Sequence, residues 1–123
     1  MTDNELTHRI TGAAIEAHKN LGPRLLESTY EECLAHELLP RNLRWERQKP
    51  FPVVYKQTKV EYGFRIDLLV ECKIVVEFKS VAGFAPIHEA IVQTYLRLSG
   101  RRLGLRINFN VPTLNDGLRR TML

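Results

Sequence analysis

Hydrophobic and polar positions follow a helical period at the start of the chain. From Asp3 or Asn4, either of which can cap a helix, to about Asn20, apolar side chains recur every three to four positions. Gly22-Pro23 ends this pattern. A second helical pattern runs from about residue 25 to residue 39, before Pro40. The chain is therefore expected to begin with two helices.

The middle of the chain changes to short apolar runs separated by turn residues, which predicts strands. After a basic connection containing Trp45, "FPVVYK" (51–56) is a candidate strand and "QTK" a candidate turn. A hairpin follows, with strands near 61–70 and 74–80, and then a helix over 86–99. "LGLRINFNV" predicts a last strand, and "PTLNDGLRRTML" a weak terminal segment. This order predicts an α/β or α+β fold, with helices packed on a sheet.

Composition narrows the class of protein. The chain has 123 residues, 44% hydrophobic and 26% charged, which predicts one domain over residues 1–123 with a real core. No apolar run approaches the ~20 residues of a membrane span. The polar N-terminus is unlike a signal peptide, so a cytoplasmic location is expected. Cys33 and Cys72 lack the spacing of a zinc site or a disulfide framework.

The net charge of +4 is concentrated near the C-terminus. Beyond Ile91 a single acid, Asp116, is set against six arginines: Arg97, Arg101, Arg102, Arg106, Arg119 and Arg120. Guanidinium groups match phosphate oxygens, so nucleic acid is a suitable partner. A solvated basic face explains the same charges equally well, and charge alone leaves both interpretations open.

The predicted hairpin "YGFRIDLLVECKIVVEFKS" (62–80) carries Asp67, Glu77 and Lys79 among apolar side chains. If its turn is the three residues 71–73, Asp67 lies directly opposite Glu77, and Arg65 lies opposite Lys79 on the same face. Like charges in such a pair are destabilising unless a cation sits between them or they share a proton. Mg²⁺ prefers oxygen ligands and suits this place. An ordinary lattice of surface salt bridges remains the alternative.

"RIDLLV" followed by "VVEFKS" resembles the core motif of the PD-(D/E)XK nuclease superfamily, an acid on one strand and (D/E)-x-K on the next. The resemblance extends to a bacterial family named for a GxxExxY motif. Its pieces cover nearly the whole chain in order: "GAAIEAHKNLGP", "LLESTYEECL", "YGFRIDLLVE", "VVEFKS", "IHEA", "TYLRLSG" and "LGLRINFNVP". The resemblance implies a restriction-endonuclease-like αβββαβ core, with a mixed central sheet flanked by helices and an extra N-terminal helix.

The resemblance also implies roles for particular residues. Asp67 and Glu77 would bind Mg²⁺ or Mn²⁺, helped by the backbone carbonyl of Phe78. Lys79 would orient or deprotonate the attacking water and stabilise the charge that develops on phosphorus. Glu27 matches the glutamate of the naming motif, and in this superfamily such a helix glutamate often completes the acidic cluster at the catalytic site. The implied chemistry is metal-assisted hydrolysis of phosphodiester bonds.

Other positions are candidates for substrate contact or depart from the family pattern. Arg24 stands at the motif's glycine position, and Ile91 where related nucleases often carry glutamine. Tyr30 is expected to be a core aromatic with a tethered hydroxyl, and His88 is either near the site or a helix-capping residue. The candidates for substrate binding are Arg65, His88, Gln93 and Arg97.

These observations favour a Mg²⁺-dependent nuclease acting on DNA, with RNA as a second substrate class. The alternative is a nuclease-like fold that binds nucleic acid or a protein without cutting, because a fold does not fix a function. The small size favours self-association as a homodimer or dependence on a protein partner, because little surface is left to read a nucleic-acid sequence.

Overall fold

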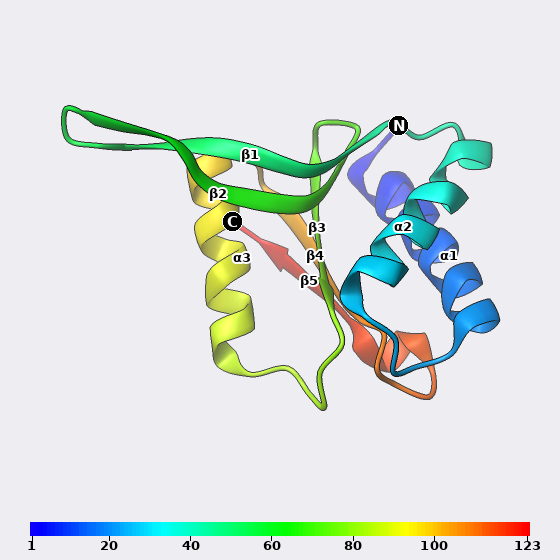
Figure 1. Cartoon of the computed structure of the whole chain (residues 1–123). Helices are drawn as coiled ribbons and strands as arrows, with labels where there is room; N and C mark the ends of the chain where they lie inside the picture. Colours follow the sequence, from blue (N-terminus) through cyan, green and yellow to red (C-terminus); the bar gives the residue numbers. More distant parts are fainter.

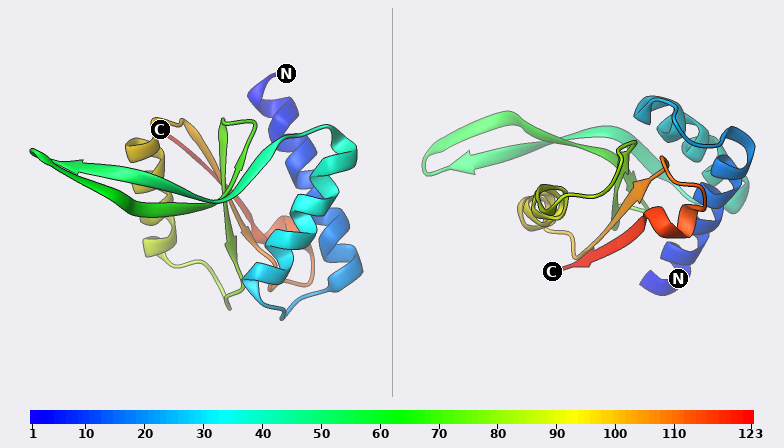
Figure 2. Two further views of the ribbon diagram at one scale, coloured as in Figure 1. Left: turned by 45° about the horizontal axis from the view of Figure 1, so that its top comes forward. Right: turned by 90° about the horizontal axis from the view of Figure 1, so that it is seen from below.

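A computed structural model describes all 123 residues, which form a mixed five-stranded sheet between helices (Figure 1). Helices α1 and α2 cover one face of the sheet and α3 covers the other, as the views in Figure 2 agree. This arrangement confirms the predicted α+β class. The elements are α1 (Asp3–Leu21), α2 (Glu27–Leu38), a 3-10 turn (Leu39–Arg41), β1 (Trp45–Tyr55), β2 (Thr58–Val70), β3 (Ile74–Lys79), α3 (Pro86–Ser99), β4 (Leu103–Asn108), a second 3-10 turn (Leu114–Gly117) and β5 (Leu118–Met122).

The ends of α1 are fixed by local hydrogen bonds. Thr2, rather than Asp3 or Asn4, is the N-cap: its hydroxyl accepts from the Glu5 N–H at 3.1 Å, and the Glu5 carboxylate accepts from the Thr2 N–H. At the other end the Gly22 N–H donates to the His18 carbonyl at 2.8 Å. None of the helices combines the length and apolar character needed to cross a bilayer.

The strands follow the order β1-β2-β3-β4-β5, and the pair β3–β4 is parallel while the other pairs are antiparallel. A parallel pair needs a crossover, and α3 supplies it. Helix α3 occupies Pro86–Ser99 as predicted, with proline in its first turn and Gly100 at φ 74° after its last residue. The crossover places the beginning of α3 near the carboxyl end of β3.

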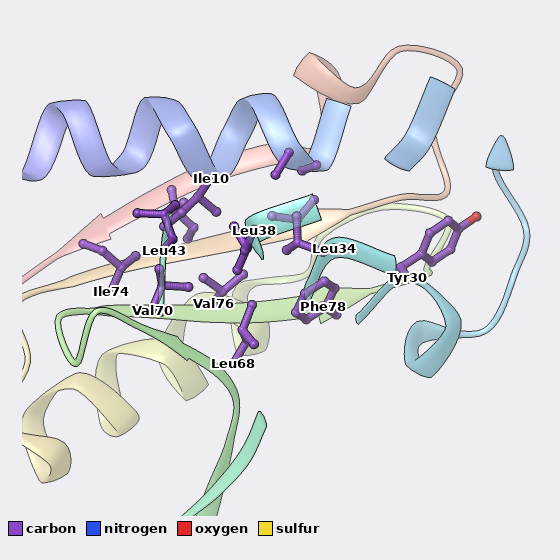
Figure 3. Packing of buried hydrophobic residues seen from close by; sticks show 14 of the residues in the cluster. Ile10, Tyr30, Leu34, Leu38, Leu43, Leu68, Val70, Ile74, Val76 and Phe78 are labelled. Carbon is purple, nitrogen blue, oxygen red and sulfur yellow. The ribbon is translucent and has the colours of Figure 1, made fainter. Parts of the chain in front are cut away.

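The larger hydrophobic core lies between the sheet and the α1–α2 pair (Figure 3). Tyr30 is fully buried there and stacks on Phe109 with ring centroids 4.2 Å apart. Its hydroxyl donates to the Gly22 carbonyl at 2.5 Å and accepts from the Leu25 N–H at 3.1 Å. Tyr30 is therefore the core aromatic with a tethered hydroxyl that the sequence predicted.

A smaller cluster lies between the sheet and α3, and consists of Ile66, Leu69, Val75, Val92 and Leu96. Gly104 of β4 lies beneath this helix, because a Cβ there would come within 2.7 Å of a Val92 methyl group. The alternate residues of β4, Leu103, Leu105 and Ile107, belong to the α1–α2 core instead. Side chains alternate along a strand, so Arg106 lies on the same face as Gly104, toward α3.

Two sequence predictions about strands are wrong. Strand β1 begins at Trp45 rather than Phe51, and it pairs with β2 from Trp45↔Val70 onward. The predicted weak terminal segment contains β5, which pairs along β4 at the edge of the sheet. Both missed stretches are rich in charged residues, which suit exposed strands but hide the apolar alternation that marks a strand.

Strands β1 and β2 continue beyond the rest of the sheet as a hairpin arm (Figure 2). Their register shifts between Phe51 and Val53. Gly63 faces this irregularity, where a Cβ would come within 2.3 Å of a Val53 methyl group, so only glycine fits without rearrangement. The far part of the arm is exposed, including Tyr55 and Tyr62.

Candidate active site

The turn between β2 and β3 has the predicted length of three residues, 71–73. The ladder begins with Val70 opposite Ile74, and Lys73 donates its N–H to the Val70 carbonyl at 3.0 Å. The predicted register is therefore confirmed for the part of the hairpin next to the turn.

The ladder ends one pair before the two acids, at Leu68↔Val76. Beyond it the Asp67 carboxylate lies between the strands, where its Oδ2 accepts from the Phe78 N–H at 3.0 Å. The Asp67 N–H in turn donates to Glu77 Oε1 at 3.5 Å. The two acids are neighbours across the hairpin, but they are not the directly opposed pair on one face that was predicted. Asp67 borders a cavity on the α2 side, whereas Glu77 lies on the same face as Val75, toward α3.

The predicted pairing of Arg65 with Lys79 is wrong, because the strands no longer pair at that level. Arg65 pairs instead with Pro50 of β1 and is exposed. Lys79 pairs with Asn108 of β4. The inserted Asp67 carboxylate is the physical reason, since it takes the N–H that a continued ladder would use.

Glu77 is buried, with 5% of its surface exposed. Burial raises the pKa of its carboxyl group to about 8, and repulsion from the Asp67 carboxylate acts in the same direction. The Lys79 ammonium partly offsets these effects. Without a stronger cation, the pair relieves its repulsion by keeping a proton on Glu77 at neutral pH.

Two further polar groups face the acids from the α3 side. Lys79 is two residues beyond Glu77, so it shares the same face of β3, and it is half-buried. The pKa of the Tyr95 phenol is raised by burial and by the charges of Glu77 and Asp67. Tyr95 also stacks on Phe64, with centroids 4.9 Å apart. The sequence pattern alone does not connect this tyrosine with the acids.

Glu27 stands at the first turn of α2, close to the end of β3. Its Oε2 accepts from the Ser80 N–H at 3.3 Å. It borders a cavity of about 260 Å³ together with Ser28, Glu31, Gln48, Asp67 and Phe78. The motif glutamate and Asp67 therefore line the same small cavity.

A hydrogen-bonded link that was not predicted from the sequence connects α2 with Asp67. Glu31 is 5% exposed and accepts from Gln48 Nε2 at 2.8 Å, and the same nitrogen lies 3.4 Å from Asp67 Oδ1. Arg47 forms a longer ion pair with Glu31 at 3.6 Å. Glu31 follows Glu27 by four residues on one helical face, a signal that was present in the sequence. Gln48 gave no such signal, because the first strand was expected to begin at Phe51, after this residue.

A family model described as the PD-(D/E)XK nuclease superfamily matches residues 4–121. This match covers almost the whole chain. The chain belongs to this superfamily. No curated protein and no solved structure gave a match.

Nucleases of this superfamily generally use divalent metals, and the donor chemistry here fits one. Asp67 and Glu77 offer carboxylate oxygens, the ligands that Mg²⁺ and Mn²⁺ prefer, and Mg²⁺ is commonly held by one or two carboxylates plus substrate phosphate. No three His, Cys, Asp or Glu side chains converge closely enough to hold an ion together. Glu27 in particular contacts Ser80 rather than completing a three-acid group.

The four residues predicted to contact substrate are spread over α3 and β2 of this chain. Gln93 and Arg97 are exposed on α3, and Arg65 is exposed on β2. His88 is half-buried and its Nδ1 accepts from the Ala85 N–H at 2.9 Å, so it caps the helix. This bond gives His88 the capping role of its alternative interpretation, and its contact with substrate stays a prediction.

The departure at Arg24 has a clear structural consequence for this nuclease-superfamily chain. Arg24 has φ 76°, in the left-handed region that favours glycine. A glycine at this position, as in the GxxExxY motif, would adopt this backbone without the cost that a side chain adds. Arg24 borders a large open pocket with Glu27, Ser80 and Asn110.

Proposed function

We propose that this chain is a metal-dependent nuclease of the GxxExxY type that hydrolyses phosphodiester bonds in DNA. The observation that carries the proposal is the pair Asp67 and Glu77, brought together beside Lys79 with no cation strong enough to offset their charge. The superfamily membership supports a nuclease over a purely structural arrangement of charges.

Each residue has a role in the proposed reaction. Asp67 and Glu77 would hold Mg²⁺ or Mn²⁺, with the Phe78 carbonyl as a further ligand. The bound ion would supply electrophilic stabilisation of the charge that develops at phosphorus. Lys79 orients the attacking water and stabilises the same charge from the α3 face. Glu27 borders the cavity beside Asp67, where it would complete the polar surroundings.

The hydrogen bonds around Asp67 support this assignment. Its two carboxylate oxygens contact the Phe78 N–H and the Gln48 amide, so the side chain is held from both sides. A ligand whose orientation is fixed before binding loses less freedom when it binds. Gln48 is therefore proposed to orient the carboxylate without touching the metal.

A second candidate is a module that binds nucleic acid or a protein without cutting. The observation in its favour is that no three ligating side chains converge. It predicts that DNA binding persists while no divalent ion supports cleavage.

Calorimetric titration with Mn²⁺ at pH 8 tests the proposal, since Glu77 must lose its proton to bind a metal. The wild type should bind one ion, and Asp67→Asn should abolish the binding. Glu61→Gln is the matched control, because it removes a carboxylate from the exposed arm of the same strand.

Cleavage of single- and double-stranded DNA completes the test. Activity should require Mg²⁺ or Mn²⁺, stop with chelator and disappear in Asp67→Asn while Glu61→Gln retains it. A wild type that binds DNA but cuts neither substrate with any divalent ion would favour the binding module.

A further inference from the structure

Two arginines lie directly opposite one another on the last two strands. Arg106 of β4 pairs with Arg119 of β5 in the antiparallel register. Paired residues share a face, so both side chains lie on the α3 side of the sheet. Like charges in this position are destabilising, so the pair calls for something that offsets two positive charges.

The residues around the pair offset these charges only in part. The Phe84 ring lies 4.7 Å from the Arg106 guanidinium carbon and 5.6 Å from that of Arg119. Arg119 also donates to the backbone carbonyls of Asp116 and Leu118 at 3.2 and 2.8 Å. Neither arginine forms a salt bridge.

Arg106 has fewer hydrogen-bond partners than Arg119. It is 7% exposed, and its Nε is buried without a hydrogen-bond partner. Burial lowers the pKa of its guanidinium, Glu89 raises it and Arg119 lowers it further. A buried guanidinium with an unpaired donor is costly unless an acceptor completes it.

The position of the pair connects it to the acids. Glu77 and Arg106 are partners in the parallel register of β3 and β4, so Glu77, Arg106 and Arg119 form one row on the same face. Neighbouring strands are ~4.8 Å apart, so the two arginine Cα atoms lie roughly 5 and 10 Å from that of Glu77. Lys79 and Asn108 occupy the next row.

We propose that Arg106 and Arg119 bind a backbone phosphate of the nucleic-acid strand, next to the phosphate that is cut. This inference rests on the proposed function for the identity of the ligand. Guanidinium forks bind phosphate oxygens in pairs, and such contacts set the register of a nucleic acid on a protein. One phosphate beside the two guanidinium groups would offset the repulsion between the arginines.

The face of the sheet distinguishes this pair from the other arginines near it. Arg120 is adjacent to Arg119 on β5, but side-chain alternation directs it to the opposite face, where it donates to Asn4 at 3.3 Å. Arg120→Gln therefore removes the same charge from the same strand without touching the proposed phosphate site. It is the matched control.

Binding of a fluorescent 20-base-pair DNA duplex, measured by anisotropy in chelator at several KCl concentrations, tests the site without any cleavage. Arg119→Gln should weaken binding about tenfold at low salt and reduce the slope of log K against log[KCl] by about 0.9, as expected for one lost phosphate contact. Arg120→Gln should change affinity less than about twofold. Arg106→Lys keeps the charge but loses the fork, and should weaken binding while the slope stays nearly unchanged.

The results separate this inference from the proposed hydrolysis. Equal losses in Arg119→Gln and Arg120→Gln, or no duplex binding by the wild type, would overturn the phosphate site. Should Arg119→Gln selectively lose binding while the wild type cuts with neither Mg²⁺ nor Mn²⁺, the phosphate site stands and the hydrolysis fails. If Arg119→Gln cleaves DNA with an unchanged KM, the hydrolysis stands and the phosphate site fails. Because Arg119 is exposed, this variant tests the site even if Arg106→Lys does not fold.

Discussion

The sheet carries two pairs of like charges, and the repulsion within each pair is relieved in a different way. Asp67 and Glu77 meet between β2 and β3, while Arg106 and Arg119 face each other on β4 and β5. The two pairs are joined because Glu77 and Arg106 are register partners on the parallel strands β3 and β4. Each pair brings together charges that a purely structural sheet would separate.

The two pairs differ in whether one member can become neutral by gaining or losing a proton. Glu77 can be neutralised, and its pKa of about 8 means that it keeps a proton at neutral pH. A guanidinium stays charged, so the arginine pair depends on the Phe84 ring and on an incoming anion. The acidic pair is therefore sensitive to pH and metal, whereas the basic pair is not.

The largest expected effect is a pH dependence of stability that comes from Glu77. Its pKa is about 8 in the folded protein against 4.5 for an ordinary glutamate, so between these values the folded state binds up to one more proton than the unfolded state. Stability from this group is complete below pH ~4.5 and is lost as the pH rises through about 8, at up to ~1.4 kcal/mol per pH unit.

Chemical denaturation in chelator at pH 5 to 8 measures this effect against Glu77→Gln, which imitates the protonated side chain. The wild type should lose about 4 kcal/mol relative to the variant over this range. Mn²⁺ at pH 8 should restore stability to the wild type alone. Parallel pH profiles for the two proteins would mean that neither burial nor the Asp67 carboxylate raises the pKa of Glu77 in the folded protein.

The next effect concerns Lys79, which shares a face of β3 with Glu77. Lys79→Ala should lower kcat for DNA cleavage about 10²- to 10³-fold, because it removes the positive group that is proposed to stabilise the developing charge. Lys73→Ala, in the turn of the same hairpin, should cut normally, since Lys73 lies 3.4 Å from Asp3 and away from the acids. Comparable losses in both variants would assign Lys79 a general electrostatic role instead.

A smaller effect is expected where Phe84 covers the arginines. Phe84→Leu should destabilise the protein by about 1–2 kcal/mol, since each cation–π contact contributes roughly 0.5–1 kcal/mol. Phe84→Tyr keeps the aromatic face and should remain close to the wild type. Unlike the effect of Glu77, this difference should not vary between pH 5 and 8, because guanidinium groups do not titrate there. Thermal denaturation at the two pH values decides between these outcomes.

The acidic pair could be predicted from the sequence because one hairpin contains it. A three-residue turn fixes the register of local strands, and alternation then brings Asp67 near Glu77. The sequence could not show that the Asp67 side chain would end the ladder, since this depends on a competition between side-chain and backbone acceptors.

The arginine pair could not be predicted in this way. Its register depends on β5, a charged edge strand whose apolar pattern is too weak to identify it. The parallel pairing that sets Arg106 beside Glu77 depends on the α3 crossover, which joins segments about 30 residues apart in the chain. Local pattern therefore found the acids and the fold class, whereas tertiary packing was needed for the arginines and for Gln48.

The smallest expected effect has the opposite sign and is the most direct test of the arginine repulsion. Arg119→Gln should stabilise the free protein by about 0.2–1 kcal/mol at low salt, the range for like charges opposite one another in a sheet. The gain should shrink as salt screens the charges. Arg120→Gln, on the other face, should give no such gain in chemical denaturation. A DNA duplex should reverse the order, because the wild type then gains a phosphate that Arg119→Gln binds poorly, and stability linked to binding follows affinity. If Arg119→Gln destabilises the free protein, its bonds to the Asp116 and Leu118 carbonyls outweigh the repulsion, and the two charged pairs are not equivalent.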